Sequence, residues 1–123
     1  MVRLLAQINL EGNEIGGYEN EDHHLVFTPE GPQAIAKALR VSTSLTRIDL
    51  TYNWIEDEGA EHLAKGISDS ASLTDIDLSY NNISPLGGIH IANAMSISTS
   101  MTYADLRYNQ LGADAEDELR RIV

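Results

Sequence analysis

A short pattern recurs in this chain at a fixed interval, and it constrains the fold more than any other feature of the sequence. Residues 45–55 read LTRIDLTYNWI, residues 73–83 read LTDIDLSYNNI, and residues 101–111 read MTYADLRYNQL, so the interval is 28 residues. A more divergent copy, LAQINLEGNEI, occupies residues 5–15. A fixed period of this length is typical of a solenoid, in which each repeat packs against its neighbours along the array.

Each copy contains two apolar residues separated by one polar residue, as in Ile48 and Leu50, and this period of two predicts a short strand. The segments between the copies also repeat, as GPQAIAKAL at 31–39, GAEHLAKGI at 59–67 and GGIHIANAM at 87–95. Their apolar residues have helical spacing. One strand and one helix in every repeat predict a parallel sheet with the helices packed behind it.

The pattern LxxLxLxxNxL and the 28-residue unit resemble the leucine-rich repeats of the ribonuclease-inhibitor type, over nearly the whole chain. The resemblance implies an α/β leucine-rich repeat solenoid of four repeats, with the parallel β-sheet on the concave face and the helices on the convex face. Proteins of this type include nuclease inhibitors, innate-immune receptors, regulators of small GTPases, tropomodulin-like actin-capping proteins and pathogen effectors. The repeats carry no particular activity with them, because one fold supports many unrelated functions.

The repeats predict a single domain over residues 1–123, divided at about 5–44, 45–72, 73–100 and 101–123. The first repeat is longer than the others, because 40 residues separate Leu5 from Leu45, which is 28 plus 12. The excess is best placed at residues 16–27, where GGYENEDHHLVF interrupts the pattern. Insertions in repeat proteins map to loops on one face, which is often the binding face.

Capping residues predict where helices begin, and the last repeat is more charged than the others. Thr28 and Ser84 are expected to be N-caps, with Pro29 and Pro85 in the first helical position. The chain closes with AEDELRRIV at residues 115–123. Because terminal repeats need a polar outer face, this segment fits a natural cap, and it equally fits a truncation point in a longer protein.

The composition excludes several classes of partner. The chain has 19 Asp and Glu against 8 Lys and Arg, a net charge of −11, so neither nucleic acid nor an anionic membrane is expected to bind. The absence of cysteine, of a signal-like N-terminus and of a long apolar run favours a soluble, cytoplasmic protein. No Walker loop, nucleophile elbow, zinc pattern or dinucleotide fingerprint is present, so we expect neither an enzyme nor a cofactor.

Because repeats stack, equivalent positions form columns along the array. A turn asparagine follows every predicted strand, at Asn13, Asn53, Asn81 and Asn109. An asparagine amide both donates and accepts hydrogen bonds, so this column is predicted to be structural and to join the turns of neighbouring repeats. A column of serines precedes the strands, at Ser44, Ser72 and Ser100. These serines are expected to bond the local backbone, since no acid–base partner accompanies them.

The outward-facing strand positions are the first candidates for a partner-binding site. Their middle column contains one amide and three carboxylates, at Asn9, Asp49, Asp77 and Asp105, about 5 Å apart in a regular sheet. The carboxylates either bind a basic protein surface or reflect a residue common at this place in the repeat. They form a row and not a cage, so no metal site is predicted. Further candidates on the same face are Arg47, Asp75, Tyr103 and Arg107.

Aromatic residues form a second candidate surface. The tyrosines Tyr52, Tyr80 and Tyr108 occupy one column, and Trp54 occupies a place that is polar in the other repeats. Tyr and Trp often dominate interface energetics, although a tyrosine column can also serve only to pack one repeat on the next. The histidines, including the adjacent pair at 23–24, lack ligand-like spacing and are expected on the surface.

We therefore predict a non-catalytic protein–protein interaction module. It is expected to bind a partner, possibly one with a basic surface, through the acidic concave strand face and the adjacent aromatic and loop surface. The alternative is a structural or self-associating segment, either a homo-oligomer or a fragment of a larger leucine-rich repeat protein. Its basis is that Met1 leads directly into the first strand, which leaves an apolar sheet edge that the insertion or a second copy could cover.

Overall fold

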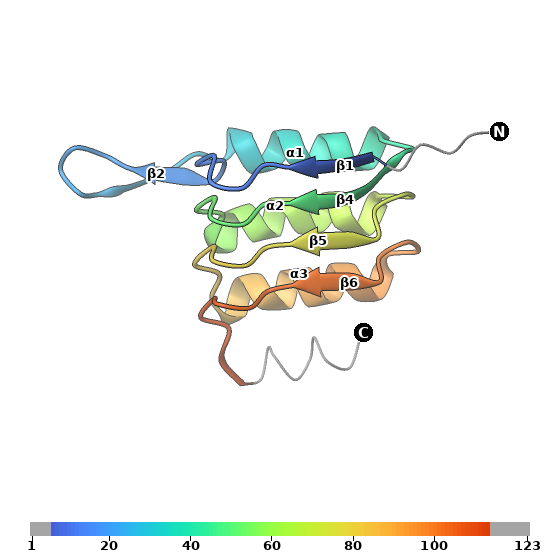
Figure 1. Cartoon of the computed structure of the whole chain (residues 1–123). Helices are drawn as coiled ribbons and strands as arrows, with labels where there is room; N and C mark the ends of the chain where they lie inside the picture. Colours follow the sequence, from blue (N-terminus) through green and yellow to red (C-terminus); the bar gives the residue numbers. More distant parts are fainter. Residues whose placement is uncertain (1–5, 114–123) are drawn as a thin grey trace.

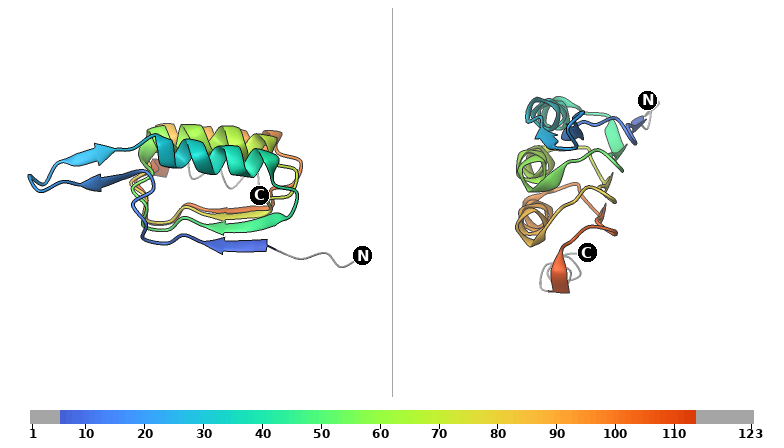
Figure 2. Two further views of the ribbon diagram at one scale, coloured as in Figure 1. Left: turned by 90° about the horizontal axis from the view of Figure 1, so that it is seen from above. Right: turned by 90° about the vertical axis from the view of Figure 1, so that its left-hand side faces the viewer.

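The computed structural model describes residues 6–113, so residues 115–123, interpreted above as a cap or a truncation point, lie outside the described range. Four parallel strands form one sheet in the order β1-β4-β5-β6. Within the described residues there are three helices. They lie in a second layer behind this sheet (Figures 1 and 2). The strands are β1 (Ala6–Asn9), β4 (Leu45–Asp49), β5 (Asp75–Asp77) and β6 (Tyr103–Asp105), and the helices are α1 (Glu30–Val41), α2 (Glu56–Asp69) and α3 (Pro85–Ile97).

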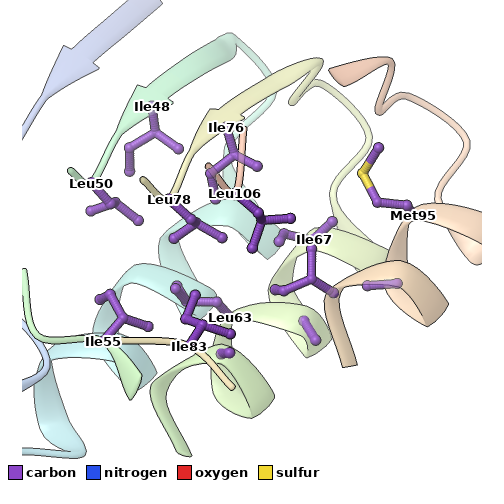
Figure 3. Close-up of a cluster of buried hydrophobic side chains, with 14 of the residues drawn as sticks. Ile48, Leu50, Ile55, Leu63, Ile67, Ile76, Leu78, Ile83, Met95 and Leu106 are labelled. Carbon is purple, nitrogen blue, oxygen red and sulfur yellow. The ribbon is translucent and has the colours of Figure 1, made fainter. Parts of the chain in front are cut away.

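The core lies between the two layers and uses the apolar positions that define the repeat. Ile48 and Ile76 point inward from adjacent strands and are paired in register. Leu63 and Ile67 from α2 meet them from the other side (Figure 3). Packed helices need about 8–10 Å of width and strands need about 4.8 Å, so stacked repeats of this kind curve with the sheet on the inside.

Glycine permits a close contact between α1 and α2. A Cβ atom at Gly66 of α2 would lie 2.6 Å from the Cα atom of Ala36 in α1. Any larger residue at this position would push the two helices apart. The backbones of α1 and α2 therefore nearly touch at this position.

The helix starts differ from the predicted caps at α1. This helix begins at Glu30 with Pro29 in the N-cap position, so the prediction of Thr28 as N-cap is wrong. The Thr28 hydroxyl instead donates to the carbonyl of Ile15 over 3.2 Å, because the insertion ends beside that residue. Since Pro29 has no side-chain donor or acceptor, no side-chain hydrogen bond caps this helix.

At α3 the predicted start is correct, but the cap comes from another repeat. The helix begins at Pro85, and Ser84 occupies the N-cap position without a side-chain bond to the helix. The carboxylate of Asp57, in α2, accepts from the N–H groups of Ser84 and Gly87 over 2.8 and 3.1 Å, and from the Ser84 hydroxyl. An acidic side chain is stabilised at a helix N-terminus, so Asp57 links the second repeat to the third.

The insertion at residues 16–27, predicted as a loop, forms an antiparallel hairpin of β2 (Gly17–Glu19) and β3 (Leu25–Phe27). The Asn20 side chain orders its turn by accepting from the N–H groups of Asp22 and His24 over 3.0 and 2.9 Å. The hairpin projects past the ends of the sheet strands (Figure 1). Its base is fixed, because the Gly16 N–H donates to the Asn53 carbonyl over 2.7 Å.

The hairpin leaves the outer edge of β1 uncovered, since it extends away from that strand and not across it (Figures 1 and 2). Ile8 is 44% exposed, whereas the equivalent Ile48 is 2% exposed. The insertion therefore does not cover this edge. Within residues 6–113 the structure contains no helix long and apolar enough to cross a membrane.

Candidate functional site

The asparagine column joins the turns of successive repeats through hydrogen bonds. The Asn81 Oδ1 accepts from the N–H groups of Asn53 and Ile55 in the preceding repeat, over 2.8 and 3.3 Å. Its Nδ2 donates to the carbonyls of Leu50 and Ser79, over 2.9 and 3.1 Å. Asn53 is bonded to its neighbouring repeat in the same way, and so is Asn109. The Asn13 amide donates to carbonyls of its own turn. These bonds leave the buried amides no capacity to contact a partner.

The aspartate column also bonds the backbone, which was not foreseen from the sequence. The Asp49 Oδ1 accepts from the N–H and the hydroxyl of Thr51, over 3.0 and 2.6 Å. The Asp77 Oδ1 accepts from the same two groups of Ser79, again over 3.0 and 2.6 Å. Asn9 in the first repeat accepts from the N–H two residues further on. The side chain that ends each strand thus orders the turn that follows it.

Asp105 differs from the other aspartates because it is paired with an arginine. Its carboxylate accepts from the Arg107 Nε and Nη2 over 3.0 and 2.8 Å, and from the Arg107 N–H over 3.1 Å. The hydrogen bonds from Arg107 hold the pKa of Asp105 below its ordinary value, against the opposing effect of burial. Asp105 is only 6% exposed, so little of this residue is accessible to a partner.

These outward positions require a side-chain acceptor, and it need not be an acid, because Asn9 makes the same bond in the first repeat. A residue without a side-chain acceptor at this position would leave unbonded the N–H group two residues later, in the turn. Asp49 and Asp77 are half-buried, and each commits one oxygen to its turn. They contribute negative potential to the strand face, while the exposed contacts must come from other residues.

The column before the aspartates supplies exposed groups on the same face. Arg47, Asp75 and Tyr103 lie side by side on adjacent strands. The Arg47 Nη1 is 3.6 Å from the Asp75 Oδ2, a surface ion pair. Such exposed pairs contribute little to stability and are available to a partner. Tyr103 is exposed. The hydrogen bonds and the charge of Asp105 raise the pKa of Arg107 above its ordinary value, with smaller contributions from Tyr103 and Tyr108.

The tyrosine column consists of three rings stacked on the outside of the turns. The centroids of Tyr52 and Tyr80 are 4.4 Å apart with their planes 11° from parallel. Those of Tyr80 and Tyr108 are 4.5 Å apart with an angle of 10°. The three residues are 50%, 40% and 63% exposed, in chain order. A continuous aromatic surface therefore runs along one side of three repeats.

Each of these tyrosines has a left-handed backbone, which is unfavourable for a bulky residue. The φ angles of Tyr52, Tyr80 and Tyr108 are 58°, 58° and 61°. A non-glycine residue in this region costs about 1 kcal/mol or more, and asparagine or glycine tolerates it better. The middle ring also carries an altered acidity. Partial burial between its neighbours raises the pKa of Tyr80 above its ordinary value, and the adjacent Tyr52 and Tyr108 add to the shift.

Trp54 lies at the base of the hairpin and is half-buried, so it is less open than the tyrosines. A Cβ atom at Gly16 would lie 2.2 Å from the Trp54 carbonyl oxygen, which means that the two backbones touch here. The hairpin and the aromatic turns therefore begin at the same place. In the described part of the chain, no group of three or more His, Asp or Glu side chains could hold a metal ion.

Comparison with known proteins identifies the repeat. A family model described as a leucine-rich repeat matches residues 41–64 and 69–92, which overlap the second and third repeats. Together with the sheet of parallel strands backed by helices, this match decides the class. The chain contains leucine-rich repeats and has the leucine-rich repeat fold. The predicted α/β solenoid fold is thereby confirmed. No curated protein sequence matches this leucine-rich repeat chain.

Solved structures share this fold, and two of them illustrate the similarity. One is Leiomodin-1 actin-binding site 2, with a TM-score of 0.71, 18% identity, and coverage of 94% of this chain and 62% of that one. The other is the tropomodulin C-terminal domain of Caenorhabditis elegans, with a TM-score of 0.74, 16% identity, and coverage of 98% and 67%. This leucine-rich repeat protein thus spans about two thirds of those chains. At these identities the similarity concerns the fold alone.

Proposed function

We propose that this leucine-rich repeat protein is a non-catalytic interaction module that binds a partner protein. Its contact surface comprises the stacked tyrosines, the exposed strand residues beside them and the base of the hairpin. We call this surface the tyrosine face, and it consists of Tyr52, Tyr80, Tyr108, Tyr103, Arg47, Asp75, Arg107 and Trp54. The observation that carries the proposal is the exposed tyrosine column with its strained backbone.

The physical basis is that the tyrosines have an unfavourable backbone conformation although their rings do not contribute to the core. The rings lie outside the hydrophobic cluster, and their backbone conformation favours smaller residues. Local conflicts of this kind concentrate at functional sites. Tyrosine is also well suited to interfaces, because a large amphipathic ring is already held in place by its neighbours and loses little conformational freedom on binding.

The charge of the chain supports a partner with a basic surface. The net charge is −11, and Asp49, Asp75 and Asp77 place negative potential on the strand face. Complementary charge mainly accelerates association and selects among partners. The two arginines of the tyrosine face already contact aspartates, so this face is a mixed surface with an acidic excess around it.

Actin is the first defined partner to test, because one solved structure of the same fold is named for an actin-binding site. The experiment compares the wild-type chain with the double variant Tyr52→Asn/Tyr108→Asn, which removes two rings and keeps residues that tolerate a left-handed backbone. The matched control is Leu86→Asn/Ile89→Asn, which removes two exposed apolar side chains from α3. Circular dichroism and a denaturation curve establish that all three are folded.

Each chain is tested for co-sedimentation with filamentous actin and for capture of proteins from a lysate. We expect the tyrosine variant to bind its partner about tenfold more weakly, or weaker still. Truncating an aromatic side chain at the centre of an interface costs about 2 kcal/mol of binding free energy. The α3 control should bind like the wild type. Equal binding by all three chains would place the interaction elsewhere, and loss by the control alone would move it to the helices.

Self-association is a second candidate function, and the exposed Ile8 on the uncovered edge of β1 favours it. An edge strand with a free side can pair with the same strand of a second copy. The variant Ile8→Lys places a charge on this edge. Sedimentation equilibrium over a range of concentrations should then show a dimer for the wild type and a monomer for Ile8→Lys. A wild-type chain that stays monomeric at high concentration contradicts self-association.

A further inference from the structure

The tyrosine column is missing one ring, at the first repeat. The backbone N–H of Tyr52 donates to the carbonyl of Ser79, and the N–H of Tyr80 donates to the carbonyl of Arg107. The N–H of Gly12 makes the equivalent bond, to the carbonyl of Thr51 over 2.9 Å. Gly12 is therefore the equivalent, in the first repeat, of Tyr52 and Tyr80 in the second and third. It occupies the remaining position of the tyrosine column and has no side chain.

The backbone at Gly12 has the same left-handed conformation as the tyrosines. Its φ angle is 72°, compared with 58° for Tyr52. A Cβ atom at Gly12 would have no atom within 4 Å, so the place that a fourth ring would take is open. Tyr80 has a ring against each of its faces, whereas Tyr52 stacks with Tyr80 alone among the described aromatic residues. One face of the Tyr52 ring is thus left for another planar group.

We propose that this open position over Tyr52 receives an arginine side chain of the partner, whose guanidinium stacks on the Tyr52 ring. The inference rests on the proposed function and specifies its partner. The ring face carries negative electrostatic potential and attracts a cation at close range. A guanidinium is planar and stacks on aromatic rings, whereas a lysine ammonium is a compact, strongly hydrated point charge.

The charges around the open position favour a cation over a neutral aromatic group. Glu11 and Glu14 are exposed on either side of Gly12 in the same turn. In the second and third repeats the equivalent positions carry uncharged residues, at 51 and 54 and at 79 and 82. The acids are therefore concentrated in the one repeat where the ring is absent. Two carboxylates close to a stacked guanidinium can accept its hydrogen bonds.

The test uses short peptides of defined chemistry. Each of the 5 tyrosines is assigned by replacement with phenylalanine, and their ring signals are followed by NMR. The chain is titrated with acetyl-Gly-Arg-Gly-amide, and with the Lys, Phe and Leu analogues at equal ionic strength. We expect the arginine peptide to shift the Tyr52 ring signals, with half-saturation at about 10 mM or above because a single exposed stacking contact is weak. The Tyr108 signals should move far less.

Two substitutions at Gly12 distinguish the effect of filling the open position with a ring from the effect of altering the turn. Gly12→Tyr supplies the missing ring and should weaken the arginine response about tenfold. Gly12→Asn tolerates the same left-handed backbone but offers no ring to cover Tyr52, so it should retain the response within about threefold. Both variants are expected to fold, since no atom would clash at the Cβ position. The left-handed backbone destabilises Gly12→Tyr, and it destabilises Gly12→Asn less.

Three results would overturn the inference. A lysine peptide that shifts Tyr52 as strongly as the arginine peptide would show a response to charge without stacking. A stronger shift with the phenylalanine peptide would assign the position to an aromatic group. An arginine response that survives Gly12→Tyr would place the peptide elsewhere. The proposed function is tested separately, because a protein captured through the tyrosine face and still bound by Gly12→Tyr would uphold the module and reject the arginine position.

Discussion

The asparagine column and the tyrosine column lie one residue apart in the same turns, but they differ in burial and in bonding. Asn53 and Asn81 are fully buried, and their side chains bond backbone groups of two repeats. Tyr52 and Tyr80 are exposed and contact each other by ring stacking. Two residues that recur at the same interval therefore have different roles: the asparagine is bonded within the turns, and the tyrosine forms part of the surface.

The first repeat distinguishes these two roles, because it has the asparagine and lacks the tyrosine. It retains the asparagine, as Asn13, although its strand lies at the edge of the sheet. It lacks the tyrosine, and Gly12 adopts the same turn without strain from a side chain. The turn thus forms without the ring. This difference indicates that the amide belongs to the folding of the repeat, and it supports the proposal that the ring serves binding.

The largest expected effect is the loss of a buried amide. In Asn81→Ala the N–H groups of Asn53 and Ile55 and the carbonyl of Leu50 lose their partner. Each buried polar group without a partner costs about 1–3 kcal/mol, so we expect the free energy of unfolding to fall by about 3 kcal/mol. Urea denaturation with an unchanged m-value measures it.

Asn13→Ala is the matched control for that change. Its amide bonds the carbonyls of Leu10 and Glu11 at an exposed end of the column. Water can replace these bonds, and we expect a loss of less than about 1 kcal/mol. Equal losses in the two variants would mean that the column is not a continuous structural feature.

A smaller effect distinguishes the aspartates. Asp77→Asn keeps the acceptor for the N–H of Ser79 and should be almost neutral. Asp105→Asn also keeps its turn bond but loses the charge paired with Arg107. The exposed arginine is screened by water, so we expect a loss of about 1 kcal/mol at neutral pH.

The pH dependence of the stability of Asp105→Asn tests whether the ion pair between Asp105 and Arg107 stabilises the fold. Because Arg107 lowers the pKa of Asp105, the pair stabilises the native state above the ordinary aspartate pKa of about 4. That contribution disappears as the pH falls through the lower, native-state pKa. The stability difference between wild type and Asp105→Asn should therefore shrink below about pH 4. A constant difference across this range would show that the ion pair does not contribute.

The fold was predictable because it depends on recurring apolar residues. Ile48 and Leu50 have a strand period, GAEHLAKGI has a helical one, and the 28-residue interval orders them. The hairpin was less accessible, since β2 and β3 are only three residues each. A signal was nevertheless present in Asn20, a turn-forming residue between Tyr18 and the apolar segment LVF at residues 25–27.

The site was harder to predict because an outward position on a strand can still bond its own backbone. Asp49 and Asp77 read as solvent-facing acids from their alternation with buried residues. The missed signal was the residue two places later, Thr51 or Ser79, whose hydroxyl bonds the same carboxylate oxygen. Asp57 was missed for a related reason, since its partners Ser84 and Gly87 belong to the next repeat. Contacts between repeats follow from stacking and cannot be read within one copy.

A small change in stability is also expected at the middle tyrosine, and it tests the comparison most directly. In Tyr80→Asn the chain loses two ring contacts, each worth about 0.5–1.5 kcal/mol, and gains a residue that tolerates the left-handed backbone, worth about 1 kcal/mol or more. These effects largely cancel, so we expect a change of less than about 1 kcal/mol by urea denaturation. Tyr80→Phe, which keeps the ring, is the control. If Tyr80→Asn instead cost as much as Asn81→Ala, the tyrosine column would be a second structural feature of the repeat, and the contrast with its neighbour would no longer point to binding.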